Sequence, residues 1–180
     1  MLSRITLCFA LVAPIGCAVQ QPAGTASPPI EVAFAPEAGA EALVVKIISS
    51  ARQSVRLAGY SFTSPAVVRS LVTAKRRGID VKVLLDDKGN RGQASLTAMN
   101  LVVNAGIPLR VVSAYPIHHD KYIVVDGKHT ETGSFNYSQA AAKSNSENVV
   151  VIWDNPPVAG RYLAQWESRW RQGIEVDSKH

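Results

Sequence analysis

The sequence predicts an α/β domain built on a mixed β-sheet with helices on both faces. Residues 30–112 alternate between strand-like and helix-like apolar patterns, which is typical of a sheet flanked by helices. Residues 121–134 then contain two short strand candidates around Asp126-Gly127, a pair that favours a tight hairpin. Hydrophobic residues make up 47% of the 180-residue chain and charged residues 18%, so a packed core is expected.

The first strand and helix lie directly after a polar N-terminal stretch. Residues 30–34 alternate apolar and small or polar side chains as in a strand, and Pro36 ends that strand. Residues 39–52 carry apolar side chains on one helical face. Residues 54–60 alternate again, which predicts the second strand.

The next helix has clear start and stop signals. Ser64 suits the N-cap and Pro65 the first turn, and a helix from there to about Arg77 ends at Gly78. A nearly continuous apolar strand over 79–85 follows, as expected where both faces are covered. A helix over 93–105 and a strand over 107–112 complete the first half.

The second half changes character at the hairpin. Its strands are expected over 121–126 and 129–134, followed by a short helix over 137–143 and a strand over 148–153. A last helix over 157–171 has one apolar stripe, formed by Leu163, Trp166 and Trp170.

The N-terminus is typical of an exported protein. Residues 1–18 combine Arg4, an apolar run too short to span a bilayer and small residues, which predicts a signal peptide. Cleavage before a lipidated Cys17 competes with ordinary cleavage near residue 18 or as late as residue 26. Residues 19–29 read as a flexible linker, so the folded domain is expected over 30–175, in the periplasm or outside the cell.

The cysteine content limits the possible kinds of catalysis and metal binding, and the net charge indicates the class of binding partner. The only cysteines are Cys8 and Cys17, which excludes thiol catalysis and a cysteine zinc site in the mature domain. The net charge of +5 favours anionic partners such as nucleic acid or phospholipid headgroups.

One stretch concentrates groups suited to phosphate esters. His119 and Lys121 are two residues apart, and so are Ser134 and Asn136, so each pair points to one side of an extended chain. If the hairpin strands are adjacent, an imidazole nucleophile meets a cation, a hydroxyl and an amide that can bind phosphate oxygens. This chemistry needs no metal or other cofactor, and no carboxylate cluster lies nearby in the sequence.

Two carboxylates have different expected roles. Asp126 begins the turn and points away from Lys121 on a regular strand, so it is interpreted as structural. Glu147 is a candidate partner for one imidazole nitrogen of His119, which would fix the tautomer.

This spacing resembles the motif of the phospholipase D superfamily without departure: His119-x-Lys121-x4-Asp126-x6-Gly133-Ser134-x-Asn136. Further similar stretches bring the resemblance to roughly residues 30–155. They are 60–64, 77–86 and 146–148. Within the superfamily, the chain is most similar to small secreted bacterial endonucleases with a single motif.

The resemblance implies a fold and a set of roles. His119 would form a phosphohistidine, while Lys121 and Asn136 bind the phosphate with help from Ser134. Glu147 matches the acid that hydrogen-bonds the histidine. Gly133, like Asp126, would belong to the structural part of the motif.

The single motif has a consequence for assembly. Family chemistry uses two histidines, one as nucleophile and one as general acid. Since this chain has one motif, the resemblance implies a homodimer with the active site on its two-fold axis.

Three functions follow from these observations. The first is metal-independent cleavage of DNA, or RNA, through the phosphate backbone. The second is the same chemistry on phospholipid headgroups, favoured by a lipid anchor at Cys17 but not by any long amphipathic helix. The third is a nucleic-acid-binding module without catalysis.

Other polar residues carry alternative interpretations. Structural or surface roles are expected for His118, His129 and His180. Residues 75–77 are basic and suit a helix C-terminus, while Lys88 and Arg91 are either phosphate contacts or solvated charges. Asp86-Asp87 alone is weak support for a metal, and Trp166 and Trp170 suit packing better than base stacking.

Overall fold

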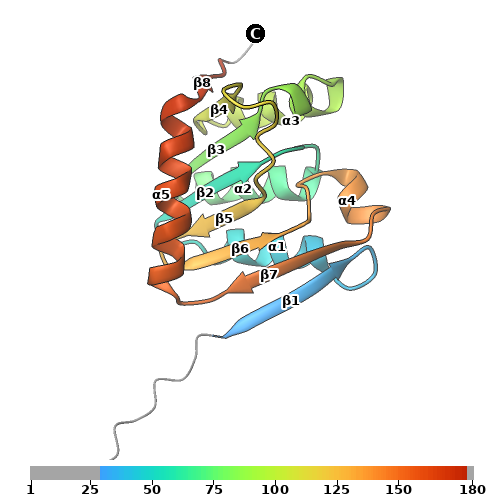
Figure 1. Cartoon of the computed structure of the whole chain (residues 1–180), viewed down its shortest axis with the longest axis vertical. Helices are drawn as coiled ribbons and strands as arrows, with labels where there is room; N and C mark the ends of the chain where they lie inside the picture. The colour runs from blue at the N-terminus through green and yellow to red at the C-terminus, as the bar shows by residue number, and fades with distance from the viewer. Residues whose placement is uncertain (1–28, 178–180) are drawn as a thin grey trace, which may run out of the picture.

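A mixed eight-stranded sheet runs through the molecule with the order β1-β7-β6-β5-β2-β3-β4-β8 (Figure 1). The computed structural model describes residues 29–177. The predicted signal peptide, with Cys17, and nearly all of the predicted linker lie outside these residues. β2, β3 and β4 pair in parallel, and the other neighbours pair antiparallel, which confirms the predicted mixed sheet.

The strands follow the predicted positions closely. Their bounds are β1 Ile30–Ala35, β2 Ser54–Gly59, β3 Asp80–Asp86, β4 Leu109–Val112, β5 Tyr122–Val125, β6 His129–Gly133, β7 Glu147–Ile152 and β8 Ile174–Glu175. The two-residue β8 was not predicted, because it is too short to show a periodicity and forms only by pairing with β4.

Helices cover both faces of the sheet, as predicted. Figure 1 shows α5 across the front, with α1, α2 and α3 behind the sheet and α4 at its right-hand end. Their bounds are α1 Ala40–Ser50, α2 Pro65–Arg76, α3 Gln93–Asn104, α4 Gln139–Lys143 and α5 Pro156–Gln172, with a 3₁₀ turn η1 at Lys88–Asn90. None of the helices in residues 29–177 is both long and apolar enough to cross a bilayer.

The end signals of α2 act as predicted. Ser64 Oγ accepts a hydrogen bond from the Val67 N–H at 3.2 Å, and Pro65 occupies the first turn. Gly78 ends the helix with φ 87°, a left-handed conformation that glycine adopts at little cost. Arg77 donates to the carbonyl of Ser49, so at least this member of the basic run 75–77 has a structural partner.

Two apolar layers sandwich the sheet. The larger lies under α1, α2 and α3, and the smaller lies between the sheet and α5. In the smaller layer Trp166 is 2% exposed, stacks on Trp170 at 4.7 Å and donates its indole N–H to the Leu57 carbonyl. Each such buried side chain contributes about 1.5–3 kcal/mol to folding. Trp166 therefore belongs to the core and is not free to stack on bases.

The edge strand β1 turns its apolar row outward. Ala33 and Ala35 face the larger core, whereas Ile30, Val32 and Phe34 are 62%, 55% and 55% exposed. The alternation in the sequence correctly indicates a strand. The larger side chains, however, lie on the exposed side, and the smaller alanines fit under α1.

A carboxyl group is buried in the larger core. Glu131 of β6 is fully buried between its strand neighbours Ile123 and Val151, and Tyr137 Oη donates to its Oε2 at 2.7 Å. Burial raises the pKa of Glu131 to about 8, although the Tyr137 hydrogen bond lowers it. Glu131 is therefore protonated in the folded protein at neutral pH.

This burial predicts a pH-dependent stability. Below the ordinary glutamate pKa of 4.5 Glu131 is protonated in both states. Above it only the folded state holds the proton, so the free energy of unfolding should fall as pH rises, levelling off above about 8. In the wild type the free energy of unfolding should decrease by roughly 2–5 kcal/mol over this pH range. Glu131→Gln keeps an acceptor for the Tyr137 hydroxyl but cannot ionise, so it should remove most of this decrease. Urea unfolding at about pH 5 and about pH 9 measures it. Glu167→Gln, at an exposed position, is the control and should keep the wild-type pH dependence.

Candidate active site

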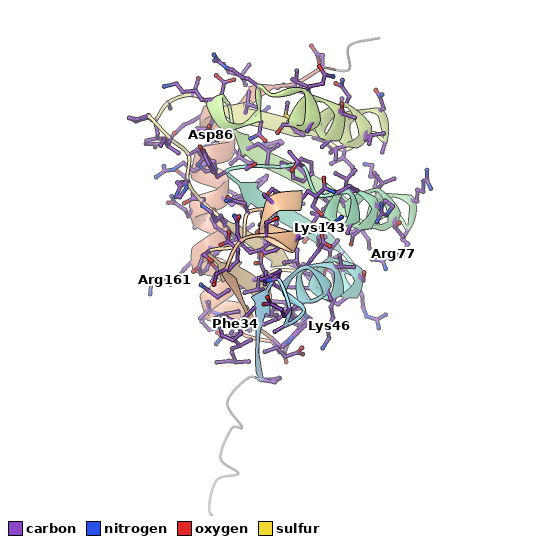
Figure 2. The ribbon with its side chains drawn as sticks, turned by 90° about the vertical axis from the view of Figure 1, so that its right-hand side faces the viewer. Phe34, Lys46, Arg77, Asp86, Lys143 and Arg161 are labelled. Carbon is purple, nitrogen blue, oxygen red and sulfur yellow. The ribbon has the colours of Figure 1, made fainter. Side chains whose placement is uncertain are left out.

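The predicted site residues gather at one edge of the sheet. β2, β3 and β6 end there, and β5 and β7 begin there, on the right-hand side of Figure 1. Figure 2 looks onto this edge, with Asp86 of β3 in the upper half and Phe34 of β1 in the lower half. Strand ends brought together in this way collect side chains that are distant in the sequence.

His119 and Lys121 lie in the segment that leads into β5. The side chain of His119 is exposed, and Lys121 is half-buried with its Nζ donating to the His119 carbonyl at 3.0 Å. Burial lowers the pKa of Lys121, while the nearby carboxylates of Glu147 and Asp120 raise it. An exposed imidazole beside a partly desolvated ammonium is suited to a phosphate ester.

Ser134 and Asn136 lie beyond the hairpin strand. β6 ends at Gly133, so the prediction of a strand that continues to Ser134 was too long. The two residues still share one side, because the intervening Phe135 and following Tyr137 are fully buried on the other. Asn136 Oδ1 is buried and accepts no hydrogen bond from the described residues, so no protein donor occupies this amide oxygen.

Glu147, the first residue of β7, is linked to Ser134. Its carboxylate accepts from Ser134 Oγ at 2.6 Å and from Asn145 Nδ2 at 3.0 Å. Ser134 Oγ in turn accepts from the backbone N–H of Asn148 at 3.0 Å. Within residues 29–177 no hydrogen bond joins Glu147 to His119, so here the carboxylate orients the serine and acts on Lys121 through its charge.

Gly133 is explained by close backbone packing. A Cβ at this position would lie 2.2 Å from the Asn148 carbonyl oxygen, which a side chain cannot do without moving the backbone. Glycine therefore lets β6 and β7 approach each other directly beside Ser134 and Glu147.

A cavity of about 610 Å³ opens next to the motif residues. One wall is the β5–β6 edge, and the other is the N-terminal half of α5. The lining residues are His119, Asp120, Lys121, Tyr122, Thr132, Gly133, Val158, Arg161, Tyr162 and Gln165. The exposed guanidinium of Arg161 adds a second cation to this space, one that sequence reasoning did not single out.

Tyr60 is a further site residue that sequence reasoning missed. Its ring packs on the His119 ring with centroids 4.7 Å apart, and Lys121 Nζ lies 5.5 Å from its centroid. In the sequence Tyr60 ends the strand predicted over 54–60 and begins the stretch 60–64 that belongs to the family resemblance, but neither signal indicates a contact with His119. Its distance of almost 60 residues from His119 hides the contact.

Two of the remaining candidates, His118 and Arg91, have acidic neighbours. His118 is buried, and burial lowers its pKa although Asp120 and Asp86 raise it. Arg91 pairs with Asp87 at 2.6 Å, so it is not a free phosphate contact. Across residues 29–177, no three histidine, cysteine or acidic side chains gather in a metal-binding arrangement.

Comparison with known proteins agrees with this geometry. The model of the family described as "Cardiolipin synthase, PLD-like domain" matches residues 44–170. The chain belongs to the phospholipase D superfamily. The crystal structure of the superfamily member Nuc from Salmonella typhimurium superposes with a TM-score of 0.83 and 49% identity, covering 84% of this chain and 100% of Nuc.

Two curated relatives extend the comparison. A "Phospholipase D" from Rickettsia bellii is 34% identical over 140 residues, covering 78% of this chain and 68% of that protein. A "Mitochondrial cardiolipin hydrolase" from Xenopus laevis is 29% identical over 130 residues, covering 72% of this chain and 60% of the hydrolase. As a phospholipase D superfamily member, the chain is a hydrolase of phosphodiester bonds.

The aspartate of the phospholipase D motif lies at the opposite end of β5 from the other site residues. Asp126 has φ 54° and Gly127 φ 65°, and both occupy the tight turn between β5 and β6. Its carboxylate accepts the backbone N–H groups of Arg52, Gln53 and Ser54 at 2.8–2.9 Å. Burial raises its pKa, but these three donors outweigh burial and hold the pKa below its ordinary value.

Replacing Asp126 should therefore reduce stability and spare catalysis. Asp126→Asn replaces the charged acceptor of these three N–H groups by a neutral amide. The substitution should therefore lower the free energy of unfolding by about 1–2 kcal/mol at neutral pH. The wild-type advantage should disappear as pH falls below the ordinary aspartate pKa of 3.8 and through the lowered pKa of the folded state. Urea unfolding and phosphodiester hydrolysis by the folded fraction measure the two effects. Asp154→Asn, at an exposed neighbouring carboxylate, is the control, and inactivity of folded Asp126→Asn would contradict a scaffold role.

Proposed function

We propose that the protein is a metal-independent endonuclease that cleaves DNA through a phosphohistidine formed on His119 of a homodimer. The observation that carries this proposal is the exposed His119 imidazole, next to Lys121, on a cavity of about 610 Å³. The cavity is open to solvent, and a second cation, Arg161, lines it.

The reaction proceeds in two displacements. An imidazole nitrogen of His119 attacks phosphorus and the P–O bond to the leaving oxygen breaks, while a second histidine gives that oxygen a proton. Water then attacks the phosphohistidine, loses a proton to the second histidine and releases His119. Lys121, Ser134 and Asn136 bind the phosphate oxygens as negative charge develops, and Glu147 holds Ser134 in place.

Several features support DNA as the substrate. The net charge of +5 favours a polyanion, and the likeness to Nuc covers that whole chain at 49% identity. Lys121 and Arg161 provide positive charge from the protein itself, so the chemistry has no need of a metal. Such backbone recognition carries little sequence preference. RNA offers the same backbone, because an enzyme nucleophile needs no 2′-hydroxyl.

The purified domain should degrade plasmid DNA in the presence of EDTA. His119→Ala should lower the rate by at least about 1000-fold, because the covalent step is lost. Gel analysis of DNA and RNA, with acid trapping of the phosphorylated protein, measures both effects. The matched control is His129→Ala, a histidine at the far end of the hairpin that should keep its activity. Activity retained in His119→Ala contradicts the mechanism, and DNA binding without turnover in the wild type would point to a silent binding module.

The second candidate substrate is a phospholipid headgroup. The Rickettsia relative carries the name phospholipase D, and the Xenopus relative is a cardiolipin hydrolase. Vesicles of phosphatidylcholine and of cardiolipin, tested beside DNA with the same His119→Ala control, separate the two substrates. Headgroup release without DNA cleavage would replace the first proposal by the second.

The homodimer part of the proposal is supported by the exposed row of β1. Ile30, Val32 and Phe34 leave more than half of their surface in solvent. In register, Phe34 lies beside Asn148, whose side chain donates to Ser134 Oγ, so the row ends at the candidate site. A two-fold interface through this row would bring a second His119 toward the first and cover the apolar surface.

A charge in the row should therefore separate the subunits. Val32→Asp should shift the protein to monomer and reduce DNA cleavage together with dimer content, because an unpaired charge would be buried. Light scattering during gel filtration and the cleavage assay measure the two changes. Leu101→Asp on α3 is the matched control, since Leu101 is also 55% exposed but lies on the helix layer behind the sheet. A wild-type monomer with full activity would refute the shared active site.

The N-terminal segment adds a proposal on location. Residues 1–18 direct export to the periplasm or the medium, with lipidation of Cys17 as the alternative to free release. Mass spectrometry of the mature N-terminus distinguishes the two, because lipidation leaves Cys17 as the first residue.

A further inference from the structure

Tyr60 is placed where it contacts two side chains of the motif at once. It follows β2 directly, and its ring meets the His119 ring edge-on at 61°, with centroids 4.7 Å apart. Lys121 Nζ lies 5.5 Å from the centre of the same ring, within the range of a cation–π contact. The ring is thus a shared neighbour of the proposed nucleophile and of the proposed phosphate-binding cation.

Core packing alone does not explain this placement. Tyr60 is only half-buried, whereas Phe62 and Tyr137 nearby are fully buried. Instead, the turn η1 (Lys88–Asn90) packs against the Tyr60 ring. A Cβ on Gly89 would lie 2.9 Å from Tyr60 Cε2, so glycine allows this turn to lie directly against the ring. The Tyr60 carbonyl also accepts from Asn90 Nδ2 at 2.6 Å.

Two buried polar side chains connect the turn η1 to the backbone at His118, next to His119. Asp86 and Asn90 are each 1% exposed. Asp86 Oδ1 accepts the His118 N–H at 2.6 Å, and its Oδ2 accepts the Gly89 N–H at 2.5 Å. Asn90 accepts the Phe62 N–H at 3.0 Å and donates to the Asp86 carbonyl at 2.8 Å. The network therefore joins the end of β2, the end of β3 and the backbone next to His119.

We propose that Tyr60 is a positioning residue for His119 and Lys121, and that Asp86 and Asn90 fix its distance from them. The Tyr60 ring limits rotation of the exposed imidazole and holds the ammonium beside it, so both face the same phosphate. Nucleophilic attack depends on such placement, because a shift of about 1 Å can slow a reaction by about 100-fold. The inference rests on the proposed role of His119 as nucleophile.

The test compares two substitutions of Tyr60. Tyr60→Ala removes the ring and should lower kcat for bis(p-nitrophenyl) phosphate by about 10–100-fold, with KM changed less than about 3-fold. Tyr60→Phe keeps the ring and should restore kcat to within about 3-fold of wild type. Loss of kcat in both variants would assign the effect to the hydroxyl group and overturn the positioning role.

Asp86 has a matched control at the other end of the sheet. Asp86→Asn places an amide N–H against the Gly89 or His118 N–H and should lower kcat as Tyr60→Ala does. Asp126→Asn loses comparable backbone contacts at the far turn and should leave kcat of the folded protein unchanged. An equal loss in both aspartate variants would show a general effect of destabilisation and contradict the proposal.

A second readout separates this inference from the proposed function. The proton resonances of the His119 imidazole should shift in Tyr60→Ala, because the ring current of a tyrosine in edge contact is lost, and they should stay near wild type in Tyr60→Phe. Wild-type protein without phosphodiesterase activity would refute the proposed function, while these resonances would still report the contact. Active wild type with unchanged kcat or unchanged resonances in Tyr60→Ala would refute the positioning role.

Discussion

The antiparallel pairing of β5 with β2 is the constraint on which the site depends. It joins the parallel half of the chain to the hairpin half, with Val55 opposite Val125 and Ala58 opposite Tyr122. This register places the start of β5, and with it His119, next to the end of β2, and with it Tyr60. A register shift of one residue would move every side chain of β5 to the opposite face of the sheet, and it would move His119 away from Tyr60.

An aspartate holds this register at each end. Asp126 accepts three backbone N–H groups at the start of β2, and Asp86 accepts the His118 N–H beyond the end of β2. Both use the same physical device, a carboxylate that binds amide donors of a segment distant in the chain. In the proposed mechanism only Asp86 affects catalysis, because it lies at the edge where the other motif residues gather, whereas Asp126 lies at the opposite end of β5.

The local parts of this arrangement could be predicted from the sequence. Strand and helix periods, the Ser64-Pro65 start and the Asp126-Gly127 turn are short-range signals, and the structure confirms them. The spacing of His119 and Lys121 is also local. Ser134 and Asn136 were expected on a strand but follow it, because β6 stops where Gly133 packs against the Asn148 backbone.

The long-range parts could not be predicted, since no local pattern encodes them. The Asp86 bond to His118 spans 32 residues, and the contact of Tyr60 with His119 spans more. Glu131 has the spacing of an ordinary strand residue, and only the packed helices on its side of the sheet make it a buried acid. The outward turn of β1 likewise depends on the small space under α1, which the alanines fit.

The proposed homodimer would explain both the exposed β1 row and the exposed position of His119, the proposed nucleophile. A lone subunit leaves more than half of the surface of Val32 and Phe34 in water, although burying each would contribute about 1.5–3 kcal/mol. The same subunit contains one copy of the motif, whereas the proposed reaction uses two histidines. The row ends beside Ser134, where the phosphate would bind, so one interface would satisfy both the apolar surface and the chemistry. In the proposed mechanism each subunit would supply half of the active site, and a second copy of the chain would meet both requirements.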